Sequence, residues 1–230
     1  MKIPENLTYD QAATVPLGFD TAAVGMYSEV LGAGLVPPWR PEGQGKYSGK
    51  PILIMGGSSS VGSYGKGKNV YKGVSHYTIV IQLARLSGFS PIITTASRSH
   101  KDYLKSLGAT NVVHRHVDKE EQKMAITEIN SSPIELVYDA ISLPETQEVA
   151  FNILAPGGTL VSTLKPVVEE NQGKSRRVVA TYGSPHVEVN HALCQEAWSV
   201  LESWLHDGVL KVRVLICRIG VTLTTARAAK

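Results

Sequence analysis

The residues best placed to do chemistry stand at the end of the run PILIMGGSSSVG, residues 51–62. Its apolar part, Ile52 to Met55, is typical of a strand buried on both faces of a parallel sheet. The part that follows is a variant of the loop that lets a backbone pass close to a pyrophosphate, because larger side chains would fill that space. A helix behind such a loop directs its free N–H groups at the anion. The candidate loop residues are Gly57, Ser58, Ser59, Ser60, Val61 and Gly62.

This loop pattern alone leaves two interpretations open. The usual second glycine is replaced by Ser59, and runs of glycine and serine are common in ordinary turns. The order of the elements downstream favours the phosphate-binding interpretation.

A second polar group follows the next apolar run, PIITTA at residues 91–96. An unphosphorylated adenosine ribose usually requires Asp or Glu at this strand end, and none occurs between Thr94 and Lys101. Hydroxyl and basic groups instead suit a 2′-phosphate, so the sequence favours NADPH over NADH. The alternative is a solvated helix start with incidental basic residues. The candidates are Ser97, Arg98, Ser99, His100 and Lys101.

Strand and helix patterns alternate about five times along the chain. The predicted strands are residues 52–55, 91–96, 111–113, 135–140, 159–163 and 177–182. The predicted helices are residues 8–13, 20–34, 77–88, 99–108, 118–130, 142–154 and 193–208. This alternation selects the α/β class, with a doubly wound (Rossmann) parallel sheet and helices on both faces. Ligands of such sheets bind at the carboxyl ends of the strands, where the glycine loop falls.

Local signals place the helix boundaries and faces. Capping boxes are predicted for Thr8 with Gln11, Ser99 with Asp102, and Ser142 with Glu145. Pro16 is expected to end the first helix, and Gly108 the one that starts at Ser99. Met124, Ile126 and Ile129 are expected to face inward.

The stretch from Ser63 to His76 interrupts the pattern between the loop and its helix. It is rich in glycine and lysine where a compact apolar helix should begin. We interpret it as an insertion. One interpretation is a basic flap over the phosphates; the favoured one is a disordered excursion that weakens the site.

Composition excludes several classes of protein. The chain has 230 residues, enough for a substantial core, and a net charge of +3, too small to indicate nucleic acid or a membrane surface as a partner. It has neither a signal-like N-terminus nor an apolar run long enough to span a bilayer. Cys194 and Cys217 lie far apart without a CxxC motif, so no disulfide framework is predicted. We expect a cytoplasmic protein that binds a small molecule.

No metal site and no hydrolytic triad are predicted. His114 and His116 could face one side near Asp118, but a metal needs a third convergent ligand. Ser59 lies in GxSxxG, which is not the nucleophile elbow. Asp139 is expected to hydrogen-bond a neighbouring turn.

Several segments together resemble the medium-chain dehydrogenase/reductase superfamily, over about Pro4 to Gly208. The similarity is closest to fungal zinc-independent members, namely quinone-oxidoreductase-like proteins and the trans-acting enoyl reductases that assist polyketide synthases. The segments are PENLTYDQAATVPLGFDTAAVGMY, ILIMGGSSSVG, IQLARLSGF, TTASRSHKDYLKSLGA, VYDAIS and LAPGGTLVSTL.

The resemblance implies NADPH-dependent hydride transfer to an α,β-unsaturated carbonyl, with an enone or polyketide-like substrate. It implies that Ser58 to Val61 hold the pyrophosphate and Ser97 to His100 the 2′-phosphate. By the same resemblance Arg115 would lie near the adenine, at a position where family members often carry Tyr, and could stack there instead. Thr163 and Leu164 would approach the nicotinamide, and Thr21 the nicotinamide or substrate. No catalytic acid can be assigned.

Family members also carry an N-terminal GroES-like catalytic domain, whereas this chain begins at the connecting helix. We therefore expect a truncated form of doubtful activity. Residues 1–50 would be connecting helices and linker, residues 51–208 the Rossmann domain, and residues 209–230 a divergent tail with strand-like alternation. A homodimer or a polyketide synthase is the expected partner.

Two other functions remain open. One is a non-catalytic nucleotide-binding module or inactive remnant. The other is a Rossmann-like methyltransferase, against which the missing acidic residue after the second strand counts.

Overall fold

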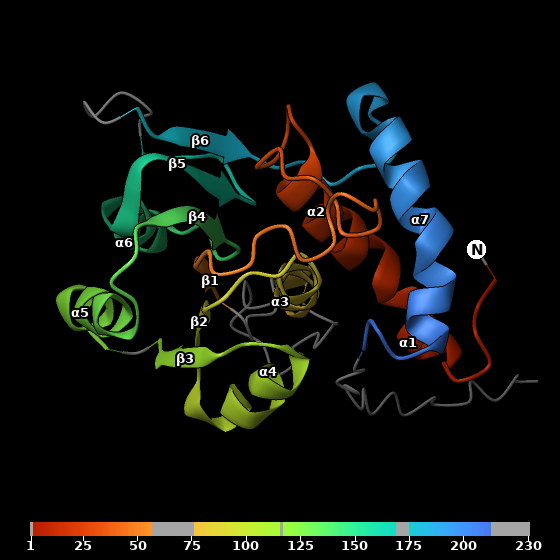
Figure 1. Cartoon of the computed structure of the whole chain (residues 1–230), viewed down its shortest axis with the longest axis horizontal. Helices are drawn as coiled ribbons and strands as arrows, with labels where there is room; N and C mark the ends of the chain where they lie inside the picture. The colour runs from red at the N-terminus through yellow and green to blue at the C-terminus, as the bar shows by residue number, and fades with distance from the viewer. Residues whose placement is uncertain (1, 57–75, 116, 169–174, 213–230) are drawn as a thin grey trace, which may run out of the picture.

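A six-stranded sheet forms the centre of the molecule (Figure 1). The computed structural model describes residues 2–56, 76–115, 117–168 and 175–212. Every pair of neighbouring strands is parallel, in the order β3-β2-β1-β4-β5-β6. The strands are β1 (Ile52–Met55), β2 (Ile92–Ala96), β3 (Asn111–His114), β4 (Ile134–Asp139), β5 (Leu154–Ser162) and β6 (Arg177–Ala180). The predicted doubly wound sheet is confirmed.

Helices cover both faces of the sheet. The helices are α1 (Tyr9–Ala13), α2 (Val15–Tyr27), α3 (His76–Leu86), α4 (Lys101–Leu107), α5 (Lys119–Ile129), α6 (Pro144–Ile153) and α7 (His191–His206). One apolar cluster joins one face of the sheet to α2, α3, α4 and α7, and a second joins the other face to α5 and α6. Ile52 and Ile54 belong to the first cluster and Leu53 and Met55 to the second, because successive strand residues point to opposite faces.

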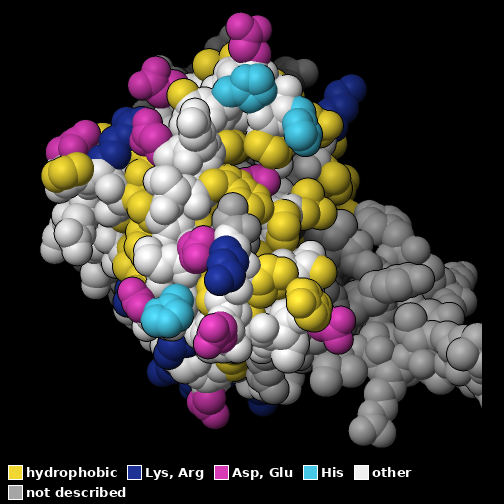
Figure 2. Space-filling model, turned by 90° about the vertical axis from the view of Figure 1, so that its right-hand side faces the viewer, with side chains coloured by type: hydrophobic (Ala, Val, Ile, Leu, Met, Phe, Trp, Pro, Cys, Tyr) yellow, Lys and Arg dark blue, Asp and Glu magenta, His cyan; other side chains and the backbone are white. Residues whose placement is uncertain are grey.

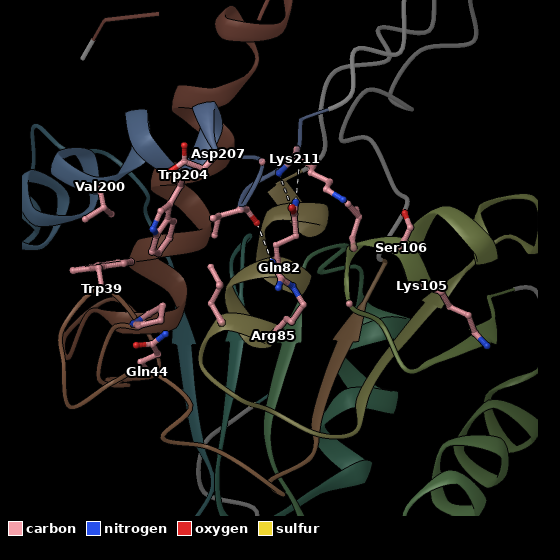
Figure 3. Close-up of a pocket in the computed structure, with 16 residues that line it drawn as sticks. Trp39, Gln44, Gln82, Arg85, Lys105, Ser106, Val200, Trp204, Asp207 and Lys211 are labelled. Carbon is pink, nitrogen blue, oxygen red and sulfur yellow. Dashed lines mark hydrogen bonds between the residues drawn. The ribbon is translucent and has the colours of Figure 1, made fainter. Parts of the chain in front are cut away.

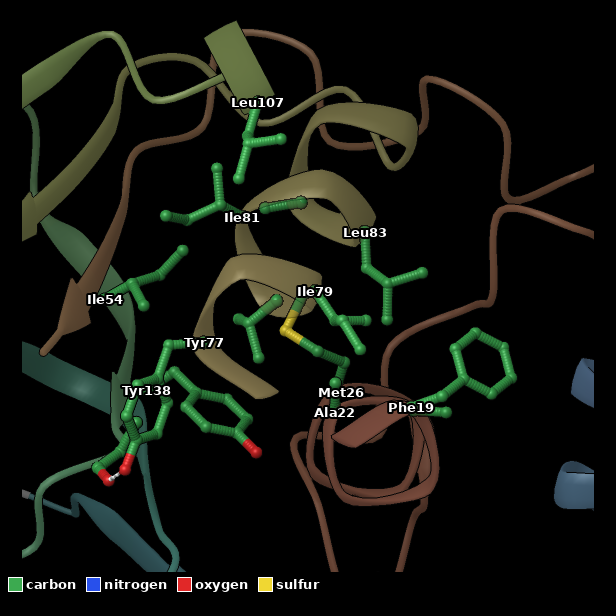
Figure 4. Close-up of a cluster of buried hydrophobic side chains, with 14 of the residues drawn as sticks. Phe19, Ala22, Met26, Ile54, Tyr77, Ile79, Ile81, Leu83, Leu107 and Tyr138 are labelled. Carbon is green, nitrogen blue, oxygen red and sulfur yellow. Dashed lines mark hydrogen bonds between the residues drawn. The ribbon is translucent and has the colours of Figure 1, made fainter. Parts of the chain in front are cut away.

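The first cluster holds α2 and α3 against the sheet (Figure 4). Phe19 and Met26 of α2 meet Ile79 and Leu83 of α3 there, beside the ring of Tyr138 from β4. All five side chains are fully buried. The core therefore fixes β4 and α3 in position against each other and against α2.

The start of α2 corrects one prediction. The helix begins at Val15 rather than Asp20, with Pro16 in its first turn, where the missing proline N–H costs no hydrogen bond. It ends at Tyr27 rather than near Gly34. The predicted capping box at the start of α1 is confirmed, because Thr8 and Gln11 exchange side-chain to backbone hydrogen bonds of 2.8 and 3.2 Å.

The other two predicted capping boxes are wrong. A 3₁₀ turn, Arg98–His100, precedes α4, which begins at Lys101 without a side-chain cap. The N-cap of α6 is Leu143, because the Ser142 hydroxyl hydrogen-bonds elsewhere. Gly108 ends α4 as predicted. Ile126 is buried, but Met124 is 61% exposed, contrary to the prediction.

Strand β5 begins earlier than predicted. It starts at Leu154 instead of Thr159, because the Pro-Gly-Gly sequence at residues 156–158 is taken into the strand with a shift of register against β4. Residues 209–212 form no strand, and the rest of the expected alternation lies outside the described residues.

Candidate functional site

The carboxyl ends of the parallel strands share one edge of the sheet, which we call the carboxyl edge. β1 lies between β2 and β4, so the strand order reverses at its end. Ligands of doubly wound sheets bind at such a switch point. Gly56 is the last described residue there, and the loop candidates Gly57, Ser58, Ser59, Ser60, Val61 and Gly62 lie outside the described residues, as does the proposed insertion up to residue 75.

Two buried threonines of β2 hold the end of β1. The Thr94 hydroxyl donates to the Ile54 carbonyl at 2.8 Å, and the Gly56 N–H donates to the Thr95 hydroxyl at 2.9 Å. Gly56 has a φ of +88°, a conformation that favours glycine. These threonines were predicted only as strand residues. Polar residues inside an apolar strand were the signal that they had a further role.

The end of β2 presents the predicted polar group to solvent. Arg98, Ser99 and Lys101 are exposed, and Ser97 and His100 are half-buried. In the described part of the chain, none of the ion pairs involves Arg98 or Lys101. The first carboxylate to follow in sequence is Asp102, exposed in the first turn of α4.

Arg115 lies beside this group, because its N–H donates to the Ala96 carbonyl at the end of β2, at 3.1 Å. Arg98 and His114 also line a hollow of about 440 Å³ that contains Glu121 and Glu128. The two glutamates partly offset the positive charge of Arg98 in this hollow. The segment from Thr94 to Lys101 itself contains no acidic residue.

Asp139, the last residue of β4, is fully buried at the carboxyl edge. Burial raises the pKa of its carboxyl group to about 6, although its hydrogen bonds oppose the shift. Two of these bonds come from the turn that follows, at 2.9 and 3.0 Å, as the sequence led us to expect, and a third comes from the Thr146 hydroxyl of α6 at 2.7 Å.

Thr163 and Leu164 directly follow β5 at the same edge, half-buried and exposed respectively. The neighbouring end of β6 carries Thr181, whose buried hydroxyl has no hydrogen-bond partner among the described residues. Sequence reasoning missed Thr181, because a hydroxyl without a partner becomes evident only once its neighbours are placed.

Thr21 is held by structural contacts. Its hydroxyl donates to the Leu17 carbonyl within α2 at 2.7 Å, and its carbonyl accepts from the Tyr138 hydroxyl at 3.1 Å. A Cβ atom at Gly183 would lie 2.3 Å from the Thr21 Cα, so the segment after β6 passes directly against it. Thr21 is thus near the ends of β4 and β6, and its contact with substrate stays a prediction.

A cavity of about 770 Å³ lies at the opposite edge, among the C-terminal ends of α3, α4 and α7 (Figure 3). There the Gln82 side chain pairs with the backbone N–H and carbonyl of Lys211 at 2.7 and 3.0 Å, and Arg85 donates to the Val209 carbonyl at 2.9 Å. None of the predicted site residues that the structure describes lines this cavity. It is therefore not the candidate site.

Within the described ranges, no group of three or more His, Cys, Asp or Glu residues could hold a metal ion. His116 lies outside those ranges. Nor does any helix of the described residues have the length and apolarity needed to cross a membrane.

The sheet order and the switch point define the class of the protein, a Rossmann-type nucleotide-binding fold. Residues 78–183 match the family model described as zinc-binding dehydrogenase. The crystal structure of CurK enoyl reductase superposes with a TM-score of 0.67 at 21% identity, covering 93% of this chain and 56% of that one. Escherichia coli quinone oxidoreductase complexed with NADPH gives a TM-score of 0.63 at 20% identity, covering 93% and 58%.

Two curated relatives are similar to the chain over most of its length. A zinc-type alcohol dehydrogenase-like protein of Schizosaccharomyces pombe is 28% identical, over 90% of this chain and 58% of its own length. Trans-enoyl reductase TOXD of Cochliobolus carbonum is 31% identical, over 78% of this chain and 52% of its own length. These matches support a place in the medium-chain dehydrogenase/reductase superfamily, and the chain spans about half the length of these two relatives.

Proposed function

We propose that the chain binds NADPH across the carboxyl edge and acts as an oxidoreductase of the enoyl or quinone reductase type. The observation that carries the proposal is the end of β2, where hydroxyl and basic side chains replace the acidic residue typical of NADH sites. Relatives named as trans-enoyl reductases support the choice of reaction.

The described residues fit such a cofactor. Arg98 and Lys101 are exposed at the strand end next to the switch point, where a 2′-phosphate would accept charge-assisted hydrogen bonds. Ser97, Ser99 and His100 would add further donors, and Arg115 would stack near the adenine. The pyrophosphate would lie against the loop that follows Gly56.

Bound NADPH would supply the hydride for an electron-poor carbon of an α,β-unsaturated carbonyl. Thr163 and Leu164 would orient the nicotinamide side, and Thr21 would contact substrate. The substrate would be a small enone or polyketide-like molecule. A second copy of the chain or a polyketide synthase would be the partner, and the cytoplasm the location.

A non-catalytic nucleotide-binding module is the second candidate. It is favoured by Asp139 and Thr21, because both are engaged in structural hydrogen bonds and neither is poised to donate a proton to a substrate.

Titration of the intrinsic fluorescence with NADPH and NADH, followed by a turnover assay with an enone, tests the proposal. We expect the Arg98→Ala variant to bind NADPH roughly tenfold more weakly, because a charge-assisted contact is lost, and to bind NADH unchanged. Arg85→Ala at the opposite edge is the matched control and should bind both cofactors as the parent chain does.

An equal loss for the two cofactors would remove the 2′-phosphate assignment. NADPH binding without turnover would select the second candidate.

A further inference from the structure

The turn that joins β4 to α6 contains a buried network of polar groups centred on Asp139. We infer that Asp139 is a positioning residue for Thr163 and Leu164, and that it acts on them through the hydroxyl of Ser142. The consequence for catalysis rests on the proposed function, whereas the positioning itself does not.

Asp139 first fixes the backbone of its own turn. One carboxylate oxygen accepts from the N–H groups of Ile141 and Ser142 at 3.0 and 2.9 Å. The other accepts from the Thr146 hydroxyl of α6 at 2.7 Å. Ser142 has a φ of +55°, which is unfavourable for a residue other than glycine. Without these acceptors the two N–H groups would lose partners that the turn conformation requires.

Ser142 then carries the constraint to the end of β5. Its hydroxyl donates to the Asp139 carbonyl at 2.6 Å and accepts from the Thr163 N–H at 2.8 Å. The Ser162 hydroxyl lies 2.9 Å from the same oxygen and 2.8 Å from the Leu164 carbonyl. Ser142 and Ser162 are both buried, so these contacts are made without solvent to replace them.

A third element supports the turn from the other side of β4. The Tyr77 hydroxyl of α3 donates to the Ala140 carbonyl, and burial followed by the nearby Asp139 charge raises the Tyr77 pKa. Tyr77 is the titratable group that bears on Asp139 among the described residues. The network thus links α3, α6 and two strand ends, and its outermost members are the two residues proposed to orient the nicotinamide.

The role depends on hydrogen-bond acceptance rather than on charge. In Asp139→Asn the amide oxygen still accepts from Ile141 and Ser142. Its NH₂ group can donate to the Thr146 hydroxyl, which in turn can donate to the Leu143 carbonyl that already lies 3.0 Å away. Asp139→Ala removes both carboxylate oxygens, so Ile141, Ser142 and Thr146 lose these acceptors, whereas the main-chain carbonyl of residue 139 remains. The asparagine variant should therefore preserve the position of Thr163, and the alanine variant should not.

The test uses the cofactor-free chain labelled with ¹⁵N. We expect Asp139→Ala to shift the amide resonances of Thr163 and Leu164 and to speed hydrogen exchange of the Thr163 amide at least tenfold, and Asp139→Asn to leave both near the parent values. Gln82→Ala, which removes a buried polar side chain at the opposite edge, is the control. With NADPH and an enone, Asp139→Ala should lower kcat several-fold more than it raises KM for the enone.

The inference is overturned if Asp139→Asn moves Thr163 as far as Asp139→Ala does, or if Asp139→Ala moves it no further than Gln82→Ala does. If Asp139→Ala does not fold, Ser142→Ala takes its place and must displace Thr163 while Ile141 keeps its parent resonance. Failure of the parent chain to bind NADPH would reject the proposed function and leave the cofactor-free result intact.

Discussion

Asp139 holds its carboxylate away from water, and this has a consequence for stability that can be measured. Its pKa is raised from 3.8 to about 6 in the folded chain. Between these values the folded state keeps a proton that the unfolded chain has released, so the free energy of unfolding falls as the pH rises through this window. Across this window the titration of Asp139 lowers the free energy of unfolding by an amount on the order of 3 kcal/mol.

Urea unfolding of the parent chain and of Asp139→Asn from pH 4 to pH 7 measures this contribution. We predict that the parent becomes less stable relative to the variant as the pH rises, and that the difference is constant above about pH 7. If the difference in unfolding free energy between the parent and Asp139→Asn stayed constant from pH 4 to pH 7, Asp139 would titrate as an ordinary exposed carboxylate.

The sequence singles out candidate polar residues, whose role in binding stays a prediction, but it does not reveal their contacts. Ser97 to Lys101 could be chosen because one missing residue type after a strand has a physical meaning. The link from Ser142 to Thr163 could not, because it joins positions 21 residues apart and depends on how β4 and β5 are aligned. Ser142 was instead assigned to a capping box that the structure does not contain.

Among the elements, α2 depends on one close approach to the sheet. A Cβ atom at Gly25 would lie 2.6 Å from the Tyr138 ring, which is fully buried under the helix. Replacing a helical glycine by alanine ordinarily stabilises by about 1 kcal/mol. At Gly25 we predict the opposite sign, a loss of roughly 1–3 kcal/mol, because the ring has no room to move.

Thermal or urea unfolding of Gly25→Ala checks this prediction through its sign. The double variant with Tyr138→Leu supplies the control, because removing the ring should make the Gly25→Ala cost smaller. A stabilised Gly25→Ala variant would contradict the packing of α2 on β4.

The strands could be predicted because each is a short apolar run. The ends of the helices could not be predicted in the same way. Pro16 ends a helix by its own preference, yet here it lies in the first turn of α2. The signal is ambiguous, since proline is equally suited to the first turn and to the residue after a helix. The Pro-Gly-Gly sequence likewise predicted a turn before the strand, but Leu154 on one side of it and Thr159 on the other both pair with β4, so it forms an irregularity within β5, with Gly157 at a φ of +79°.

For the whole molecule, the contact between α2 and α7 joins the two ends of the described chain. The Trp198 indole N–H donates to the buried Asp20 carboxylate at 2.6 Å, and burial raises the Asp20 pKa. In Trp198→Phe this carboxylate loses its donor, so we predict a loss of about 2 kcal/mol in unfolding free energy at pH 7.

The loss of unfolding free energy in Trp198→Phe should become smaller as the pH falls, because a protonated, uncharged Asp20 is stabilised less by a hydrogen-bond donor. Trp204→Phe is the control, because the Trp204 indole packs against Trp39. Its loss of unfolding free energy should not depend on pH in this way. Equal pH dependence in the two variants would contradict the assignment of the Trp198–Asp20 contact.

The side of the molecule that carries α1 and α7 shows apolar side chains among charged ones (Figure 2). Tyr9 and Leu17 are 83% and 77% exposed on α1 and α2. Periodicity predicted the core positions of the sheet and of most helices, with Met124 as an exception, but gave no indication of this surface. An apolar side chain at a helix position has the same pattern whether or not another element covers it.

NADPH titration of the ¹⁵N-labelled chain tests directly whether NADPH lies across the carboxyl edge. We predict that the amide resonances of Gly56, Arg98 and Thr163 shift with a common affinity, while those of Gln82 and Lys211 at the opposite edge do not move. Shifts confined to Gln82 and Lys211, or no shifts at saturating NADPH, would contradict the account.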